Sequence, residues 1–119
     1  MRRPTMVLIL MAGMVALLAG VAYAATIEGT DRDDILRESQ RNDQMYGLAG
    51  EDQLLADYDG GDTDVLRGGR GPDYLKAEDK DSRDSLFGGR GFDTCYIDQD
   101  AQGKEDDASG CDMTIVILP

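Results

Sequence analysis

Aspartate is the residue whose number and spacing in this chain best indicate a chemistry. The 119 residues contain 24 acidic side chains, 19 of them Asp, and no histidine. Seven aspartates each stand two positions before a Leu, Met or Cys, at successive steps of 9, 9, 12, 9, 11 and 9 residues. They are Asp34, Asp43, Asp52, Asp64, Asp73, Asp84 and Asp93. A short carboxylate repeated in this way predicts a series of equivalent sites for a hard cation such as Ca2+.

Glycines accompany every second one of these aspartates. Segments 47–52, 68–73 and 88–93 are glycine-rich six-residue turns, and 29–34 is a similar turn with Arg32 in place of a glycine. Glycine tolerates the backbone conformations with which a tight turn can point several carbonyl oxygens at one ion. We expect Arg32, a cation beside the ligands, to weaken the first site. The predicted calcium ligands are Asp34, Asp52, Asp73, Asp93, Gly47, Gly50, Gly68, Gly69, Gly71, Gly88, Gly89 and Gly91, with Asp43, Asp64 and Asp84 as weaker ones.

A short strand is expected after each aspartate, with the apolar residue in the middle pointing inward. The predicted core is therefore a thin stack of Leu36, Met45, Leu54, Leu66, Leu75 and Leu86. The competing interpretation is an acidic, glycine-rich disordered segment. Disorder does not explain why an apolar residue follows each of these seven aspartates at the same interval.

The complete pattern G-G-x-G-x-D-x-U-x stands at 68–76 and 88–96. It resembles the repeats-in-toxin (RTX) calcium-binding nonapeptide, and the resemblance extends over about residues 29–96. This resemblance implies an all-β fold, a parallel β-roll of about seven nonapeptide repeats. In such a roll two successive repeats form one coil, each turn stacks on the turn two repeats later, and Ca2+ lies between the stacked turns.

The resemblance also implies that the two edges of the roll differ. The glycine-rich turns would stack along one edge, called here the regular edge, with about three calcium ions between successive pairs of Asp34, Asp52, Asp73 and Asp93. The opposite, irregular edge would carry Asp43, Asp64 and Asp84 together with two insertions, at 56–59 and 77–80. Any ions at that edge are expected to bind weakly.

Residues 1–24 resemble a secretory signal peptide. Arg2 and Arg3 precede an apolar run at 6–21, and small residues lead up to a cleavage site after Ala24. A retained membrane anchor is the alternative, although the run is marginal in length and no basic patch follows it. We therefore predict a secreted, extracellular protein without stable membrane insertion after cleavage, and association with the cell surface stays open.

Two predicted segments make up the remainder of the chain, the β-roll at 25–96 and a C-terminal cap at 97–119. The cap combines an acidic loop with an apolar, β-branched strand at 113–118, which would close the open end of the roll. A disulfide between Cys95 and Cys111 would tie this strand to the last repeat. A reactive dithiol is the alternative, but the C-x-x-C spacing typical of such thiols is absent.

Composition excludes several functions. From residue 25 onward 24 acids face 10 bases, which argues against nucleic acid as a partner. The absence of histidine removes Ser-His-Asp chemistry and most zinc sites. A thin solenoid also offers no cleft in which paired carboxylates could acquire separate pKa values, so no enzyme is expected. The prediction is a secreted structural module folded by Ca2+, and the alternative is a calcium-scaffolded adhesion or protein/glycan interaction protein that uses the irregular edge near Tyr58.

Overall fold

The computed structural model describes residues 25–57, 62–80 and 83–118, so the predicted signal peptide at 1–24 and Tyr58 lie outside the described residues. Ten strands occur in these residues. They are β1 (Ala25–Glu28), β2 (Ile35–Arg37), β3 (Asp43–Tyr46), β4 (Gln53–Ala56), β5 (Val65–Arg70), β6 (Tyr74–Ala77), β7 (Ser85–Arg90), β8 (Thr94–Asp98), β9 (Asp107–Ser109) and β10 (Met113–Ile117). Within the described part of the chain, no helix has the length and apolar character to cross a membrane.

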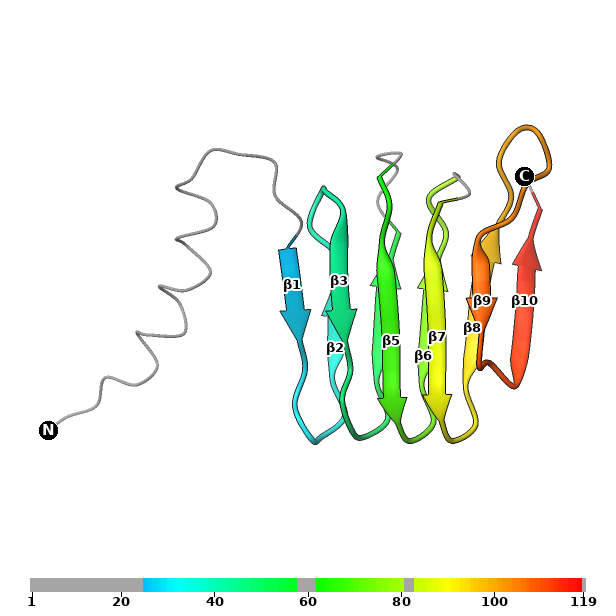
Figure 1. Cartoon of the computed structure of the whole chain (residues 1–119). Coiled ribbons are helices and arrows are strands. Elements are labelled where there is room, and N and C mark those ends of the chain that lie inside the picture. Colours follow the sequence, from blue (N-terminus) through cyan, green and yellow to red (C-terminus); the bar gives the residue numbers. More distant parts are fainter. Residues whose placement is uncertain (1–24, 58–61, 81–82, 119) are drawn as a thin grey trace, which may run out of the picture.

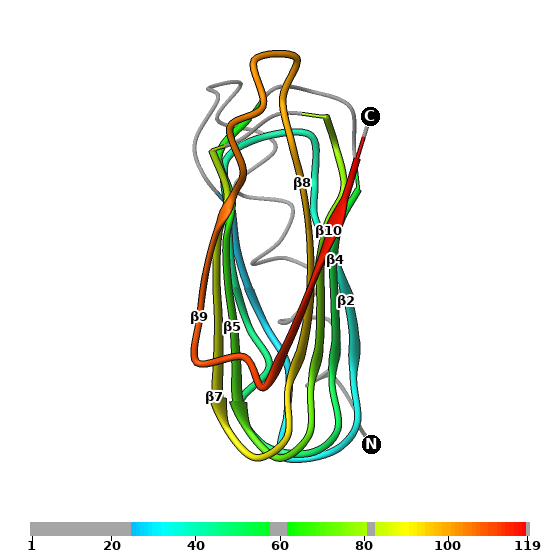
Figure 2. The same ribbon diagram turned by 90° about the vertical axis from the view of Figure 1, so that its right-hand side faces the viewer.

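The strands alternate between two parallel sheets. One sheet has the order β1-β3-β5-β7-β9 and the other the order β10-β8-β6-β4-β2. Tight turns connect the sheets at one edge, the lower edge in Figure 1, and longer connections do so at the other. Figure 2 shows the two sheets face to face along the whole roll. Each strand therefore pairs with the strand two places later, which confirms the predicted all-β parallel β-roll.

The predicted number of about seven repeats needs correction. The described strands form about four full turns of the solenoid, which is more than seven repeats at two per turn would form. Each sheet has five strands. The difference arises because β1 and β9 join the first sheet although their sequences lack the nonapeptide pattern. β1 pairs with β3 and β9 with β7. Backbone pairing thus extends the roll beyond the residues that the repeat identifies.

The core is a pair of side-chain ladders between the sheets. Met45, Leu66 and Leu86 are in register in one sheet, and Leu54 and Leu75 in the other. All five are fully buried. Leu36 is only half-buried because β2 is the end strand of its sheet. The predicted core is confirmed.

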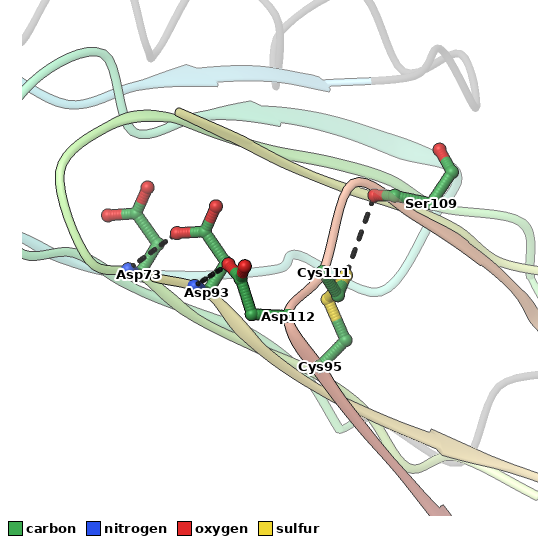
Figure 3. The surroundings of a disulfide bond; sticks show 6 residues. All are labelled: Asp73, Asp93, Cys95, Ser109, Cys111 and Asp112. Carbon is green, nitrogen blue, oxygen red and sulfur yellow. Dashed lines mark hydrogen bonds between the residues drawn. A yellow bond between two sulfur atoms is a disulfide. The ribbon is translucent and has the colours of Figure 1, made fainter. Parts of the chain in front are cut away.

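The C-terminal strand closes the roll as predicted. β10 pairs in parallel with β8 along its whole length, from Met113 opposite Thr94 to Ile117 opposite Asp98. The Cys95–Cys111 disulfide is formed and closes a loop with a sequence separation of 16 residues (Figure 3). Closing a loop of this size stabilises the folded state by about 3 kcal/mol in the chain-entropy model. Cys95 is fully buried at a position where the preceding coil has Leu75.

Leu48 is held in a conformation that suits glycine. Its φ is 78°, and the equivalent residues of the next coils, Gly69 and Gly89, have φ of 100° and 98°. The neighbouring coils fix this backbone, because the Arg70 N–H donates a 2.7 Å hydrogen bond to the Leu48 carbonyl oxygen. A left-handed conformation is strained for a residue with a Cβ.

We therefore expect Leu48→Gly to stabilise the folded protein by roughly 1 kcal/mol relative to Leu48→Ala, because both variants lose the side chain but only the first relieves the strain. Urea unfolding of the calcium-saturated variants measures the difference. Equal midpoints for the two variants would contradict this account of Leu48.

Candidate metal centre

A continuous file of aspartates runs along the regular edge. The backbone N–H of each one donates to a carboxylate oxygen of the aspartate in the next coil. The bonds are Asp34 to Asp52 at 2.8 Å, Asp52 to Asp73 at 2.9 Å, Asp73 to Asp93 at 2.8 Å, and Asp93 to Asp112 at 2.8 Å. Figure 3 shows the last two. Sequence reasoning missed Asp112, because its second following residue is Thr114 rather than an apolar one.

The other carboxylate oxygen identifies this file as a candidate cation site. The Oδ2 atoms of Asp52, Asp73 and Asp93 are buried and have no hydrogen-bond partner. A Cβ placed on Gly47 would lie 2.6 Å from Asp52 Oδ2 and 2.5 Å from the Gly68 carbonyl oxygen. A carboxylate oxygen and a carbonyl oxygen of the next coil therefore face one small space that only glycine leaves open.

The same arrangement recurs in the following coils. Near Gly68, Asp73 Oδ2 and the Gly88 carbonyl oxygen face one space, and near Gly88 the pair is Asp93 Oδ2 and the Gly110 carbonyl oxygen. Oxygen-only donors of mixed carboxylate and carbonyl type are what Ca2+ prefers. The residues present thus fit a calcium ion in each space.

The first coil places the same pair of oxygens, Asp34 Oδ2 and the Gly47 carbonyl oxygen, near Gly29, but its carboxylate differs from the other three. Asp34 is half-buried, and its Oδ2 already accepts hydrogen bonds from the Thr30 backbone N–H at 2.6 Å and from the Thr30 hydroxyl at 2.9 Å. Asp34 therefore has less unsatisfied oxygen to offer a cation. The expectation that the first site is the weakest stays a prediction, and Thr30 supplies a second reason for it besides Arg32.

The remaining predicted glycines lie in two further files of the same edge. Gly50, Gly71 and Gly91 have φ between 103° and 113°, while Gly69 and Gly89 form the other file. An added Cβ on any of them would collide with the backbone of the coil before. These glycines let successive turns approach closely enough for oxygens of two coils to meet.

The irregular edge carries a second file of aspartates. The N–H of Asp43 donates to Asp64 at 2.7 Å, that of Asp64 to Asp84 at 2.7 Å, and that of Asp84 to Asp106 at 3.1 Å. Asp64 and Asp84 each bury an Oδ2 without a hydrogen-bond partner. Asp43 differs, because the Ser39 N–H and hydroxyl donate to its two oxygens. Asp43, Asp64 and Asp84 were predicted to be weaker calcium ligands, and lower burial is not a reason for them to be so.

Comparison with protein families now bears on this geometry. The model of the RTX calcium-binding nonapeptide repeat, given as four copies, matches residues 20–54 and 58–95, more than half of the chain. The chain belongs to this family. No curated protein and no solved structure gives a match. The RTX β-roll described above is accordingly a calcium-binding structural unit.

Burial makes the carboxylates of this RTX roll hard to ionise on the regular edge. Burial raises the pKa of Asp73 to about 7, because desolvation outweighs the hydrogen bond from the Asp52 N–H, and the charges of Asp93 and Asp52 add repulsion. Burial also raises the pKa of Asp52 and of Asp93. A bound cation would remove this penalty by compensating the charge.

The irregular edge shows the same effect, most strongly at Asp84. Burial raises the pKa of Asp84 to about 9 despite the hydrogen bond from the Asp64 N–H, and repulsion from Asp79 contributes to the shift. Burial raises the pKa of Asp64 to about 6 against the hydrogen bond from the Asp43 N–H. The two edges therefore pose the same electrostatic problem.

These shifts set the pH dependence of the calcium-free protein. Folded-state pKa values of about 6, 7 and 9 for Asp64, Asp73 and Asp84 lie above the ordinary value of 3.8. Their contribution to stability is thus complete below about pH 4 and is lost as the pH rises through 6, 7 and 9. We expect protein stripped of calcium to be more folded at pH 4.5 than at pH 8 by circular dichroism. Stability that rises with pH in the same stripped protein would show that these aspartates are not buried as described.

Proposed function

We propose that the protein is a secreted, non-catalytic calcium-binding module and that binding of Ca2+ drives its folding. The observation that supports the proposal is the row of buried, unpartnered Oδ2 atoms of Asp52, Asp73 and Asp93 along the regular edge. Burying such charges without compensation is costly, and a thin core provides little free energy to offset that cost. Calcium binding and folding would then share one free energy.

The three most complete calcium sites lie between successive pairs of the last four coils. Asp52, Asp73 and Asp93 would each provide Oδ2, with the carbonyl oxygens of Gly68, Gly88 and Gly110 from the following coil. The proposal keeps about three ions on the regular edge but moves the predicted sites one coil toward the C-terminus. The reasons are that Asp34 Oδ2 already accepts a hydrogen bond from Thr30 and that Asp112 extends the file of aspartates.

Export is part of the proposal and rests on the signal-like sequence of residues 1–24. Calcium is scarce inside cells and abundant outside them, so a chain that needs the ion to fold would fold after export. An exported form that begins at Ala25 by intact mass supports this step, and an exported form that retains Met1 contradicts it.

A second candidate function is a calcium-scaffolded interaction protein. A hollow lies beside the regular edge on the outer face of the sheet formed by β2, β4, β6, β8 and β10. Its lining includes Ile35, Tyr74, Phe92, Asp33 and Glu51. Ile35 and Phe92 are 64% and 60% exposed and line the same hollow, so they offer apolar surface to a partner. Calcium-dependent binding to a glycan or protein panel that Phe92→Ser abolishes would favour this function, and absence of binding would oppose it.

The calcium sites are tested by counting bound ions. We expect Asp73→Asn to bind one calcium ion fewer than the wild-type protein in a calorimetric titration, because Asn lacks the charge that binds the ion. Asp34→Asn is the matched control, since it removes the same charge from the same edge at a carboxylate already satisfied by Thr30. A full ion count in Asp73→Asn, or an equal loss in both variants, would contradict the assignment.

A further inference from the structure

The irregular edge contains a group of carboxylates that the glycine-rich turns do not account for. Asp64 immediately precedes β5, Asp84 immediately precedes β7, and Asp79 follows β6 within the insertion at 77–80. One oxygen from each of the three lies within 4.8 Å of the other two. Two neighbouring coils thus contribute to a single cluster of three acids.

All three acids are withdrawn from solvent. Asp64 is 0% exposed, Asp84 1% and Asp79 3%. The Oδ1 atoms of Asp64 and Asp84 accept backbone N–H groups, so each directs only its Oδ2, buried and without a hydrogen-bond partner, to this cluster. Three buried carboxylates at such separations cannot all be ionised without a compensating cation.

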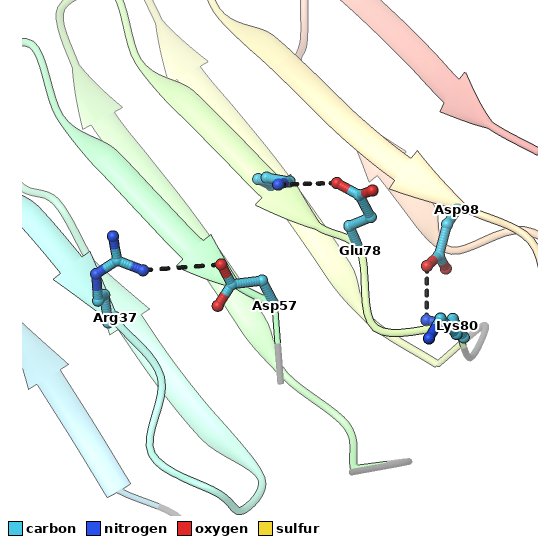
Figure 4. A network of polar contacts seen from close by, with 6 residues as sticks. Arg37, Asp57, Glu78, Lys80 and Asp98 are labelled. Atoms are coloured by element: carbon cyan, nitrogen blue, oxygen red, sulfur yellow. Dashed lines mark hydrogen bonds and ion pairs between the residues drawn. The ribbon is translucent and has the colours of Figure 1, made fainter. Parts of the chain in front are cut away.

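The loop that carries Asp79 is fixed by its backbone. Lys80 has a φ of 72°, and its N–H donates a 2.6 Å hydrogen bond to Asp98 Oδ2 in the next coil (Figure 4). Glu78, on the other side of Asp79, turns outward and forms a 2.8 Å ion pair with Lys76. Asp79 is thus buried between Lys80, whose backbone is fixed by Asp98, and Glu78, which pairs with Lys76.

We propose that Asp64, Asp79 and Asp84 form a divalent-cation site on the irregular edge, built from side-chain carboxylates alone and suited to Ca2+. Oxygens that surround one Ca2+ at about 2.3–2.6 Å are separated by up to roughly 5 Å, which the cluster matches. Mg2+ requires shorter, near-octahedral coordination and retains water, so it fits three buried carboxylates less well.

This site would act as a clamp between coils. It joins Asp64, at the end of the connection between β4 and β5, to the connection between β6 and β7, so the ion links two successive connections of the irregular edge. A second group, formed by Glu38, Asp62 and Asp64, adjoins it and shares Asp64. The site requires no glycine turn, and it stands whether or not the regular edge binds calcium.

The test counts calcium ions by equilibrium dialysis on the purified protein and on two adjacent variants. We expect Asp79→Asn to bind one ion fewer than the wild-type protein. Glu78→Gln is the matched control, because it removes a neighbouring charge whose partner is Lys76 on the outer face, and it should retain the full count (Figure 4). Equal counts in all three proteins would overturn the proposal.

A second measurement covers the case in which Asp79→Asn does not fold. Wild-type crystals grown with calcium chloride should give an anomalous difference peak between Asp64, Asp79 and Asp84, and a map without that peak would overturn the site. These experiments test the irregular edge separately from the regular edge, because the calcium count of Asp73→Asn tests the regular edge.

Discussion

The structure depends on buried aspartates that hold successive coils together by hydrogen bonds. At each edge, one oxygen of an aspartate accepts the backbone N–H of its counterpart in the coil before, so the file sets the stacking of the turns. The same bonds bring the carboxylates into a row where their charges repel. A network that needs the carboxylate for geometry and cannot tolerate its charge requires a counterion or a proton.

Much of the fold could be predicted because the repeat carries it in the sequence. The interval between each Asp and its apolar partner identified Met45, Leu66 and Leu86 as core residues, and the glycines identified the tight edge. Asp106 and Asp112 escaped notice, since small Ala108 and polar Thr114 stand two residues after them. β1 and β9 were also missed, because they become strands by pairing with a neighbouring coil and carry no repeat pattern of their own.

The candidate sites were harder to predict than the fold. The sequence indicated which turns contain candidate ligands, but not which oxygen of each aspartate already accepts a hydrogen bond. Thr30 satisfies Asp34, whereas Asp93 keeps a free oxygen and faces Gly110. Asp79 lies in an insertion, where no repeat marks it, and only the stacking of coils brings it to Asp64 and Asp84.

The two edges therefore offer cations different chemistry within one roll. The regular edge combines one carboxylate with backbone carbonyls in a glycine-rich turn. The irregular edge instead gathers three buried carboxylates in one cluster, of which Asp79 comes from the insertion at 77–80. Ions at both edges would compensate the same kind of buried charge, so their binding should be coupled through the shared core.

The most direct test of calcium-driven folding is far-UV circular dichroism of the protein from Ala25 onward, with its disulfide intact, at pH 7.5 in chelator and during addition of calcium. The account predicts a largely unfolded spectrum in chelator and a cooperative gain of β-structure near millimolar calcium that magnesium does not produce. A β-rich spectrum in chelator that calcium leaves unchanged would show that the buried carboxylates are accommodated without the ion, and the central claim would be wrong.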